Sequence, residues 1–207
     1  MKVFSNSVTF DYSWEEVSTA NWRKYCPWND KSTHVTAVDT LSRHVDPETG
    51  VLRTERLITC KQSPPAWVRN AIGTCMDESI VYETSYVDPR RRSVTMVSQN
   101  LTWSNLVNVQ ETVMYRPVMP ETGERKDQTQ FLQEAKITAL CGGWQRIKNG
   151  IEDGLIGRFR ENAQKGREGF ERVLEMSRQV FAEEREKENM GLIRQQARNI
   201  RQAHPVR

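Results

Sequence analysis

The stretch Gly143 to Gln179, GWQRIKNGIEDGLIGRFRENAQKGREGFERVLEMSRQ, decides how the rest of the chain folds. Its apolar residues recur at steps of four, three, four and three, a spacing that predicts one face of a long amphipathic helix. These residues are Phe159, Ala163, Gly166, Phe170 and Val173, and Leu174, Val180 and Phe181 extend the row. We therefore expect one long helix against which the preceding residues fold.

A second row of side chains runs along the edge of this apolar face. Arg158, Asn162 and Lys165 have the same four-then-three spacing, so they project from neighbouring turns of the helix. One interpretation is an ordinary core helix with a solvated flank. The other is that an apolar face edged by cations binds an amphiphile with an anionic head group.

The chain has 207 residues, and its length and composition favour one domain with an extension and no segment that spans a membrane. No run approaches the ~18 consecutive apolar residues of a spanning helix. The first residues alternate like a strand and lack the features of a secretory signal or a transit peptide. The net charge of +3 and the pI of about 8.7 are too mild to indicate a nucleic-acid partner.

Residues 3–10 predict a first strand whose apolar side chains share one face, interrupted by Asn6. The pattern changes to that of a helix at Ser13. Glu16 follows three residues later, which matches a capping box. We expect a short helix from this point to about Lys24.

Six further strands follow, separated by turn signals. They are predicted at residues 34–44, 51–59, 79–87, 93–101, 107–115 and 130–140. Because short turns join most neighbours, the economical architecture is a curved antiparallel meander of about seven strands with the helices on its concave side. The predicted fold class is therefore α+β.

The connection at residues 61–73 differs from the other turns. Its proline, aromatic and apolar residues are Pro64, Pro65, Trp67, Val68 and Ile72. One interpretation is a plain strand connection whose Trp fills the core. The other is a hinged lid whose apolar tip covers a cavity or enters a bilayer interface, where Trp and cations are favoured.

The sequence contains no pattern typical of a catalytic or metal-binding site. A nucleophile elbow, a phosphate-binding loop, an HExxH helix and a dinucleotide fingerprint are all absent. The four cysteines are widely spaced, so we expect reduced, mostly buried thiols and no metal. Glu152 and Asp153 are adjacent and point about 100° apart on a helix, which does not suit a catalytic pair. We expect a protein that is not an enzyme.

Five stretches of the chain form a series in a characteristic order. They are residues 1–25 (MKVFSNSVTFDYSWEEVSTANWRKY), 32–46 (STHVTAVDTLSRHVD), 54–68 (TERLITCKQSPPAWV), 100–115 (NLTWSNLVNVQETVMY) and 158–170 (RFRENAQKGREGF). Together they resemble the PRELI/MSF1 family of lipid-transfer proteins of the mitochondrial intermembrane space, over about residues 1–180. The ERLIT run, followed by a single Lys before residues 62–73, and the NLT segment are most similar to the Slowmo-like, phosphatidylserine-transferring branch.

The resemblance implies a fold, a cargo and a binding site. The fold is a seven-stranded antiparallel sheet wrapped around the long C-terminal helix, similar to the START and Bet v 1 grip, with residues 61–73 as a lid that contacts the membrane. The cargo is one phospholipid, with its acyl chains inside, its head group near basic residues and no further cofactor. The implied head-group and entrance residues are Lys24, Arg158, Asn162, Lys165 and Lys61.

The resemblance also implies a location and a partner. We expect transfer of phosphatidylserine between the outer and inner mitochondrial membranes, which supports phosphatidylethanolamine synthesis. The implied partner is a small helical-hairpin protein with twin CX9C cysteine pairs, and contact with anionic membranes is transient. Two alternatives stay open: transfer of phosphatidic acid for cardiolipin synthesis, or an interaction protein with a filled core whose basic tail binds a helix or nucleic acid.

Two features modify this expectation. Residues 181–207 are highly charged, so they predict an extension, helical or disordered, after a lipid-transfer domain at residues 1–180. Family members usually carry a Trp after the Glu-Asp pair, whereas this chain has Gly154. Because each helical glycine costs up to about 1 kcal/mol, we expect the first turns to be irregular or the helix to begin near Ile151.

Overall fold

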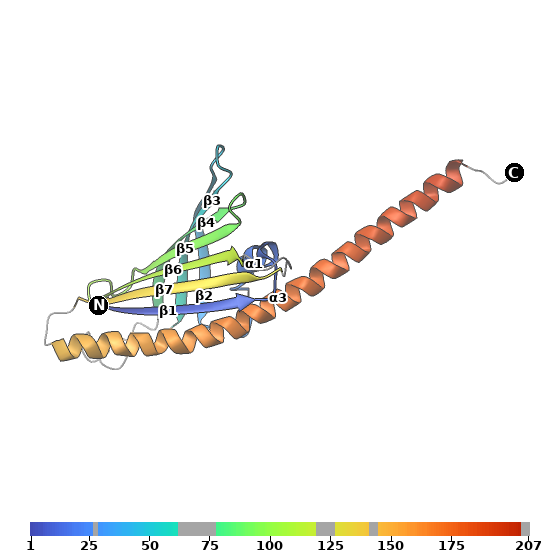
Figure 1. Cartoon of the computed structure of the whole chain (residues 1–207). Coiled ribbons are helices and arrows are strands. Elements are labelled where there is room, and N and C mark those ends of the chain that lie inside the picture. The colour runs from blue at the N-terminus through green and yellow to red at the C-terminus, as the bar shows by residue number, and fades with distance from the viewer. Residues whose placement is uncertain (27–28, 62–77, 119–126, 141–144, 204–207) are drawn as a thin grey trace.

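A curved seven-stranded sheet and two helices make up the described part of the chain in the computed structural model (Figure 1). The structure describes residues 1–26, 29–61, 78–118, 127–140 and 145–203. The sheet curves around one side of the long C-terminal helix. The predicted α+β architecture is therefore confirmed.

The strands pair in a meander with one added edge strand. Their bounds are β1 (Lys2–Phe10), β2 (Val35–Val45), β3 (Leu52–Lys61), β4 (Glu78–Asp88), β5 (Ser93–Asn100), β6 (Val107–Pro117) and β7 (Thr129–Ala139). Helix α1 spans Trp14–Asn21 and helix α3 spans Gln145–Ala203. All pairs are antiparallel in the order β1-β7-β6-β5-β4-β3-β2. The first strand pairs with the last because α1 and the following turns carry the chain across to β2 at the opposite edge.

Aspartate side chains shape two of the hairpin turns. In the β2–β3 turn, Asp46 Oδ1 accepts a hydrogen bond from the Glu48 N–H at 2.9 Å, and Gly50 has a φ of 74°. Glycine adopts this left-handed conformation without a Cβ clash. In the β4–β5 turn, Asp88 Oδ1 accepts from the Arg90 N–H at 3.0 Å. Both turns satisfy backbone donors locally, which is why the sequence marks them clearly.

Helix α1 begins with the predicted capping box. Ser13 Oγ accepts from the Glu16 N–H at 3.2 Å, and the Glu16 carboxylate accepts from the Ser13 N–H at 2.9 Å. Glu16 also forms an ion pair of 2.8 Å with Arg178 of α3, and the hydrogen bond from Arg178 lowers the pKa of Glu16. One side chain therefore caps α1 and joins it to α3. The helix ends at Asn21, earlier than predicted, and turns follow it as far as Tyr25.

The hydrophobic core lies where α1, α3 and the concave face of the sheet meet. Phe170, Val173 and Leu174 of α3 are buried there. The ring centroid of Phe170 lies 5.5 Å from that of Phe10 and 5.8 Å from that of Tyr115. The predicted apolar row is therefore confirmed as core at these three positions.

The ends of the predicted row behave differently from its centre. Phe159, Ala163 and Gly166 are only half-buried. Val180 belongs to the same helical row but is exposed, because α3 has by then passed the sheet (Figure 1). Phe181 is half-buried, with the Arg23 guanidinium 5.1 Å from its ring centroid.

Helix α3 is continuous from Gln145 to Ala203, so the expectation of an irregular or later start is wrong. Tertiary contacts compensate for the low helix propensity of its glycines. Ile151 and Glu152 are buried, and Glu152 Oε1 accepts a hydrogen bond from the Ala139 N–H at 3.0 Å. This bond lowers the pKa of Glu152 and fixes the start of α3 to the end of β7. No structural feature marks the predicted domain boundary at residue 180, which stays a prediction.

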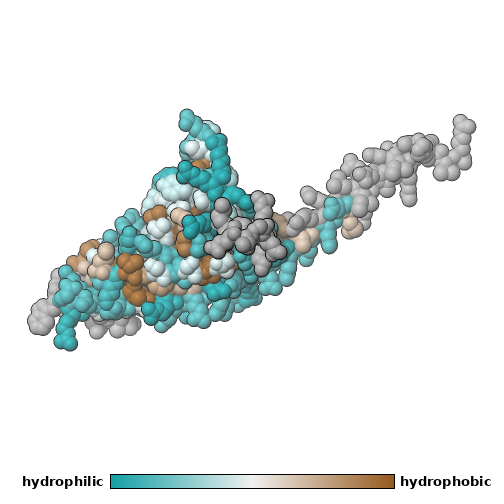
Figure 2. Space-filling view, viewed as in Figure 1, coloured by the Kyte–Doolittle hydropathy of each residue, from teal (hydrophilic) through white to brown (hydrophobic). Residues whose placement is uncertain are grey.

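On the face shown in Figure 2, the surface is mixed over the sheet and mainly hydrophilic along the coloured part of α3. The exposed apolar residues of the strands are distributed over both edges and the centre: Val3, Leu41, Val45, Ile80, Tyr86 and Val97. Scattered apolar residues of this kind are normal for a protein surface. The apolar face of α3 is thus turned inward, toward the concave side of the sheet.

Gly169 marks a close contact between α3 and the turn before β2. A Cβ atom at this position would lie 2.7 Å from Lys31 Cβ and 3.4 Å from Asn29 Oδ1. Gly169→Ala should push the turn away from the helix and lower the free energy of unfolding by about 1–3 kcal/mol. Urea unfolding followed by circular dichroism measures this loss.

Gly154→Ala is the matched control in the same helix. No atom lies within 4 Å of a Cβ built there. This substitution should leave stability unchanged or raise it by up to about 1 kcal/mol. Equal stabilities of the two variants would contradict the close packing at Gly169.

Candidate functional site

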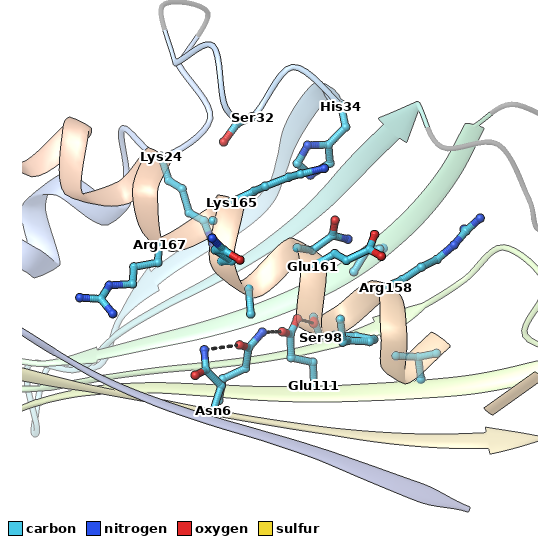
Figure 3. A pocket seen from close by; sticks show the side chains of 18 of the residues that line it. Asn6, Lys24, Ser32, His34, Ser98, Glu111, Arg158, Glu161, Lys165 and Arg167 are labelled. Atoms are coloured by element: carbon cyan, nitrogen blue, oxygen red, sulfur yellow. Dashed lines mark hydrogen bonds between the residues drawn. The ribbon is translucent and has the colours of Figure 1, made fainter. Parts of the chain in front are cut away.

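A cavity of about 960 Å³ lies between the concave face of the sheet and α3 (Figure 3). Its volume is at the upper end of the usual range for small-molecule sites. Apolar side chains from the strands and from α3 form part of its wall: Val8, Val81, Leu106, Val107, Val109, Phe131, Leu155 and Phe159. The space is therefore suited to a ligand with a large apolar part.

The cavity exists because α3 contacts the sheet through large side chains and crosses the space between them with small ones. Phe159 contacts Phe4 of β1, with ring centroids 5.8 Å apart, and Phe170 contacts the core. Between these two contacts Ala163 and Gly166 face the cavity and are too small to fill it. The same apolar row thus anchors the helix and leaves a space beneath it.

Four of the five predicted head-group residues line this cavity. They are Lys24, Arg158, Asn162 and Lys165, of which three come from α3 and Lys24 from the turns after α1. Lys61 is exposed at the end of β3 and is absent from the lining formed by the described residues. The predicted lid and membrane-contact residues, Pro64, Pro65, Trp67, Val68 and Ile72, lie outside the described residues.

Lys24, Lys165 and His34 form a cationic cluster at the cavity. The pKa of Lys24 is raised, first by Tyr25, whose ring centroid lies 5.3 Å from the ammonium, and also by the charge of Glu111. The pKa of His34 is lowered by partial desolvation and by the positive charges of Lys24 and Lys165, although part of the side chain is exposed. At neutral pH the His34 imidazole beside the two lysines is therefore neutral and can donate a hydrogen bond.

The turn that carries His34 is fixed to the neighbouring elements by its own polar side chains. Asn29 is buried, and its Nδ2 donates to the Lys24 carbonyl at 2.7 Å and to Ser32 Oγ at 3.2 Å. Asp30 forms an ion pair of 2.8 Å with Arg172 of α3. These contacts, together with the close approach at Gly169, hold the turn against the same helix that carries Lys165.

A row of polar side chains crosses the concave face, with one residue from each of six strands. We call Asn6, Gln133, Glu111, Ser98, Glu83 and Arg56 the polar row. Register places several of them side by side: Asn6 opposite Gln133, Ser98 opposite both Glu111 and Glu83, and Glu83 opposite Arg56. A buried polar group is costly unless it is hydrogen-bonded, so the contacts within this row determine its effect.

Hydrogen bonds join neighbouring residues at each end of the polar row. On the cavity floor, Gln133 Nε2 donates to Glu111 Oε1 at 2.5 Å, and Ser98 Oγ donates to Glu111 Oε2 at 3.2 Å (Figure 3). At the other end Arg56 Nε donates to Glu83 Oε1 at 3.0 Å within a buried ion pair. Four residues of the row line the cavity: Asn6, Ser98, Glu111 and Gln133.

Sequence reasoning missed His34 and the polar row, although the sequence carried a signal for the row. In a strand, alternate residues share a face. Asn6 interrupts the apolar face of β1, Glu111 lies between Val109 and Val113, and Gln133 occupies the same face as Phe131. His34 had no comparable signal, because its position depends on how the preceding turn packs.

The described residues provide neither a metal cluster nor a spanning helix. Among them no group of three His, Cys, Asp or Glu side chains is arranged to hold a metal ion, and no helix has the length and hydropathy needed to cross a bilayer. Cys26 and Cys60 are free thiols but only half-buried, less than predicted, and the other two cysteines lie outside the described residues.

Fold and site together define a class of proteins in which a curved sheet and one long helix border a large cavity with cationic side chains in its wall. The sequence pattern of the PRELI-like family matches residues 15–180. The chain therefore belongs to the PRELI-like family.

Relatives with curated names support this assignment. The chain is 48% identical over 187 residues to the mitochondrial protein UPS2 of Saccharomyces cerevisiae, covering 90% of this chain and 76% of the relative. It is 46% identical to a UPS-like protein of Schizosaccharomyces pombe, over 84% of this chain and 90% of the relative. It is 32% identical to the slowmo homolog of Dictyostelium discoideum, covering 79% of this chain and 67% of the relative.

Solved structures share the fold at low sequence identity. TTHA0849 from Thermus thermophilus superposes with a TM-score of 0.53 at 13% identity, covering 85% of this chain and 99% of that one. Ara h 8.0201 superposes with a TM-score of 0.51 at 8% identity, covering 84% of this chain and 97% of that one. At this identity the likeness concerns the fold alone.

His34 provides a test of the cationic cluster. Because burial and two lysines lower its pKa, the folded protein should release the His34 proton below the usual value of 6.5. Stability present above about pH 6.5 is then lost as the pH falls toward the lowered pKa, since the unfolded chain binds the proton more readily. An NMR titration of the imidazole measures the midpoint.

Lys165→Gln should raise that midpoint, since it removes one of the two positive charges. Arg160→Gln is the matched control, because Arg160 is exposed on the same helix and is absent from the cavity lining formed by the described residues. An equal midpoint in the Lys165 variant and the unmodified protein would show that these groups do not interact.

Proposed function

We propose that the protein is a phospholipid carrier that moves phosphatidylserine between the outer and inner mitochondrial membranes across the intermembrane space. Such transfer would supply phosphatidylethanolamine synthesis. The observation that carries this proposal is the cavity in which Lys24, Lys165 and Arg158 adjoin an apolar wall. A phospholipid has the same two parts, an anionic phosphate and apolar acyl chains.

A carrier of this kind lowers the barrier to lipid movement without making or breaking a bond. A lipid that leaves a bilayer exposes its acyl chains, which costs about 0.8 kcal/mol for each methylene that enters water. The cavity replaces that exposure with contacts to side chains such as Val107, Val109 and Phe159. The protein is proposed to act by binding and release, as a carrier and not as an enzyme.

The location and the partner are parts of the same proposal. The name of the yeast relative supports a mitochondrial location. We propose that a small helical-hairpin protein with twin CX9C cysteine pairs forms a heterodimer with the chain and retains it in the intermembrane space. Docking on the membrane is proposed to be transient and to be favoured by anionic lipids, so it should weaken with increasing salt.

The volume of the cavity and its cationic cluster help to compare the alternative functions. A volume of about 960 Å³ favours a carrier over an interaction protein with a filled core. Phosphatidic acid, which would supply cardiolipin synthesis, remains the second candidate cargo, because the cationic cluster suits any phosphate monoester or diester. Transfer experiments must therefore compare the two lipids directly.

The test is fluorescence-dequenching transfer between donor and acceptor vesicles, with the twin-CX9C partner present. The single variants Arg158→Ala, Asn162→Ala and Lys165→Ala should each slow the transfer of phosphatidylserine about tenfold, since each removes an interaction with the head group worth roughly 1–2 kcal/mol. The lipid content of the purified protein, measured by mass spectrometry, should fall in parallel.

The matched control is Arg160→Ala on the exposed side of the same helix. It should transfer lipid at the unmodified rate. Normal transfer by all three cavity variants would contradict the proposed site, and transfer of phosphatidic acid alone would replace the cargo. Absence of any transfer and any bound lipid would refute the carrier function.

A further inference from the structure

Glu111 is a carboxylate on the floor of a cavity whose other charged groups include a cationic cluster. A carboxylate would weaken a site that binds phosphate alone, because like charges repel at short range. After Tyr25 and Tyr115, the Glu111 charge also contributes to the raised pKa of Lys24. Glu111 and Lys24 both line the cavity, approaching it from the sheet and from the turns after α1 (Figure 3).

The hydrogen bonds around Glu111 hold it in one orientation. An ionised carboxylate only accepts hydrogen bonds, so Gln133 must direct its NH2 group to Glu111. The Gln133 carbonyl then faces Asn6, and Asn6 Nδ2 donates to it at 3.4 Å. The Ser98 hydroxyl donates to the second oxygen of Glu111 at 3.2 Å. Residues of β5, β7 and β1 thus orient this carboxylate of β6 on the cavity floor.

The contacts leave Glu111 with further capacity to accept hydrogen bonds. A carboxylate offers about four lone-pair positions, and Gln133 and Ser98 occupy one on each oxygen. Both donors are neutral, so they satisfy hydrogen bonding without cancelling the charge. A cationic donor that enters the cavity would complete the site.

We propose that Glu111, oriented by Gln133 and Ser98, binds the ammonium group of an aminophospholipid while Lys24 and Lys165 bind its phosphate. This inference rests on the proposed carrier function and assigns the cargo to lipids that carry an amine on the head group. Phosphatidic acid lacks the amine and carries more negative charge on its phosphate. It is therefore disfavoured at Glu111, so the carboxylate selects aminophospholipids against a cargo that the cations alone would also bind.

The test is the Glu111→Gln variant, which keeps the side-chain shape and removes the charge. The amides of Gln133 and Asn6 can turn to pair with the new amide. Transfer is measured between phosphatidylcholine vesicles that carry acyl-labelled phosphatidylserine, phosphatidylethanolamine or phosphatidic acid. The ratio of the rates for phosphatidylserine and phosphatidic acid should fall at least tenfold, with slower transfer of both aminophospholipids and equal or faster transfer of phosphatidic acid.

Two further variants complete the design. Ser98→Ala removes one of the donors that orient Glu111 and should lower the same ratio by a smaller factor, which keeps the test valid if Glu111→Gln does not fold. Gln110→Ala changes the neighbouring residue on the exposed face of β6 and should leave every rate unchanged.

The outcomes separate this inference from the function on which it rests. An unchanged ratio in a folded Glu111→Gln variant overturns the amine site. An equal loss of rate for all three lipids also overturns it, because Glu111 would then act only by holding Lys24 in place. Failure of the unmodified protein to transfer any of the lipids would instead overturn the carrier function itself.

Discussion

The distance between α3 and the sheet depends on a few aromatic contacts, and most of the remaining structure follows from them. Phe170 packs against Phe10 and Tyr115 at one end, and Phe159 packs against Phe4 at the other. Between them, small residues of α3 leave space that the curved sheet does not fill. The helix therefore contacts the sheet at two places, and the segment between these contacts forms one wall of the cavity.

This arrangement explains why polar residues can occupy the concave face of the sheet. In a filled core, a row from Asn6 to Arg56 would carry the full cost of desolvation. Here the row borders the cavity at one end and forms a buried ion pair between Arg56 and Glu83 at the other. The core lies on the α1 side of the row, where Val113 and Tyr115 continue β6 beyond Glu111.

Much of the fold could be predicted from local patterns. Strand alternation, the Ser13–Glu16 capping box and the Asp46 turn rely on neighbours in sequence, so their signals are contained in short windows. The pairing of β1 with β7 could not be predicted in this way, because it depends on where the chain between them travels. The start of α3 was also mispredicted, because a buried contact of Glu152 with the end of β7 outweighs the propensity of nearby glycines.

The residues of the candidate site also differ in whether their positions could be predicted from local sequence patterns. Helical spacing placed Arg158, Asn162 and Lys165 together because all three belong to one element, and the family resemblance added Lys24. His34 reaches the site through a turn that Asn29 and Asp30 fix to distant residues, which no periodicity reveals. Glu111 and Gln133 are polar residues on an apolar strand face, and their hydrogen bond requires the register of two strands.

The cavity also has a thermodynamic consequence for the folded state. Side chains around a cavity of this size make fewer dispersion contacts with one another than those of a filled core, so the fold gains less stability there than its burial pattern suggests. Any molecule that fits the space and binds only the folded chain restores those contacts and shifts the folding equilibrium by mass action. The fraction of folded protein, and with it the resistance to proteolysis, thereby becomes a readout of the local supply of that molecule.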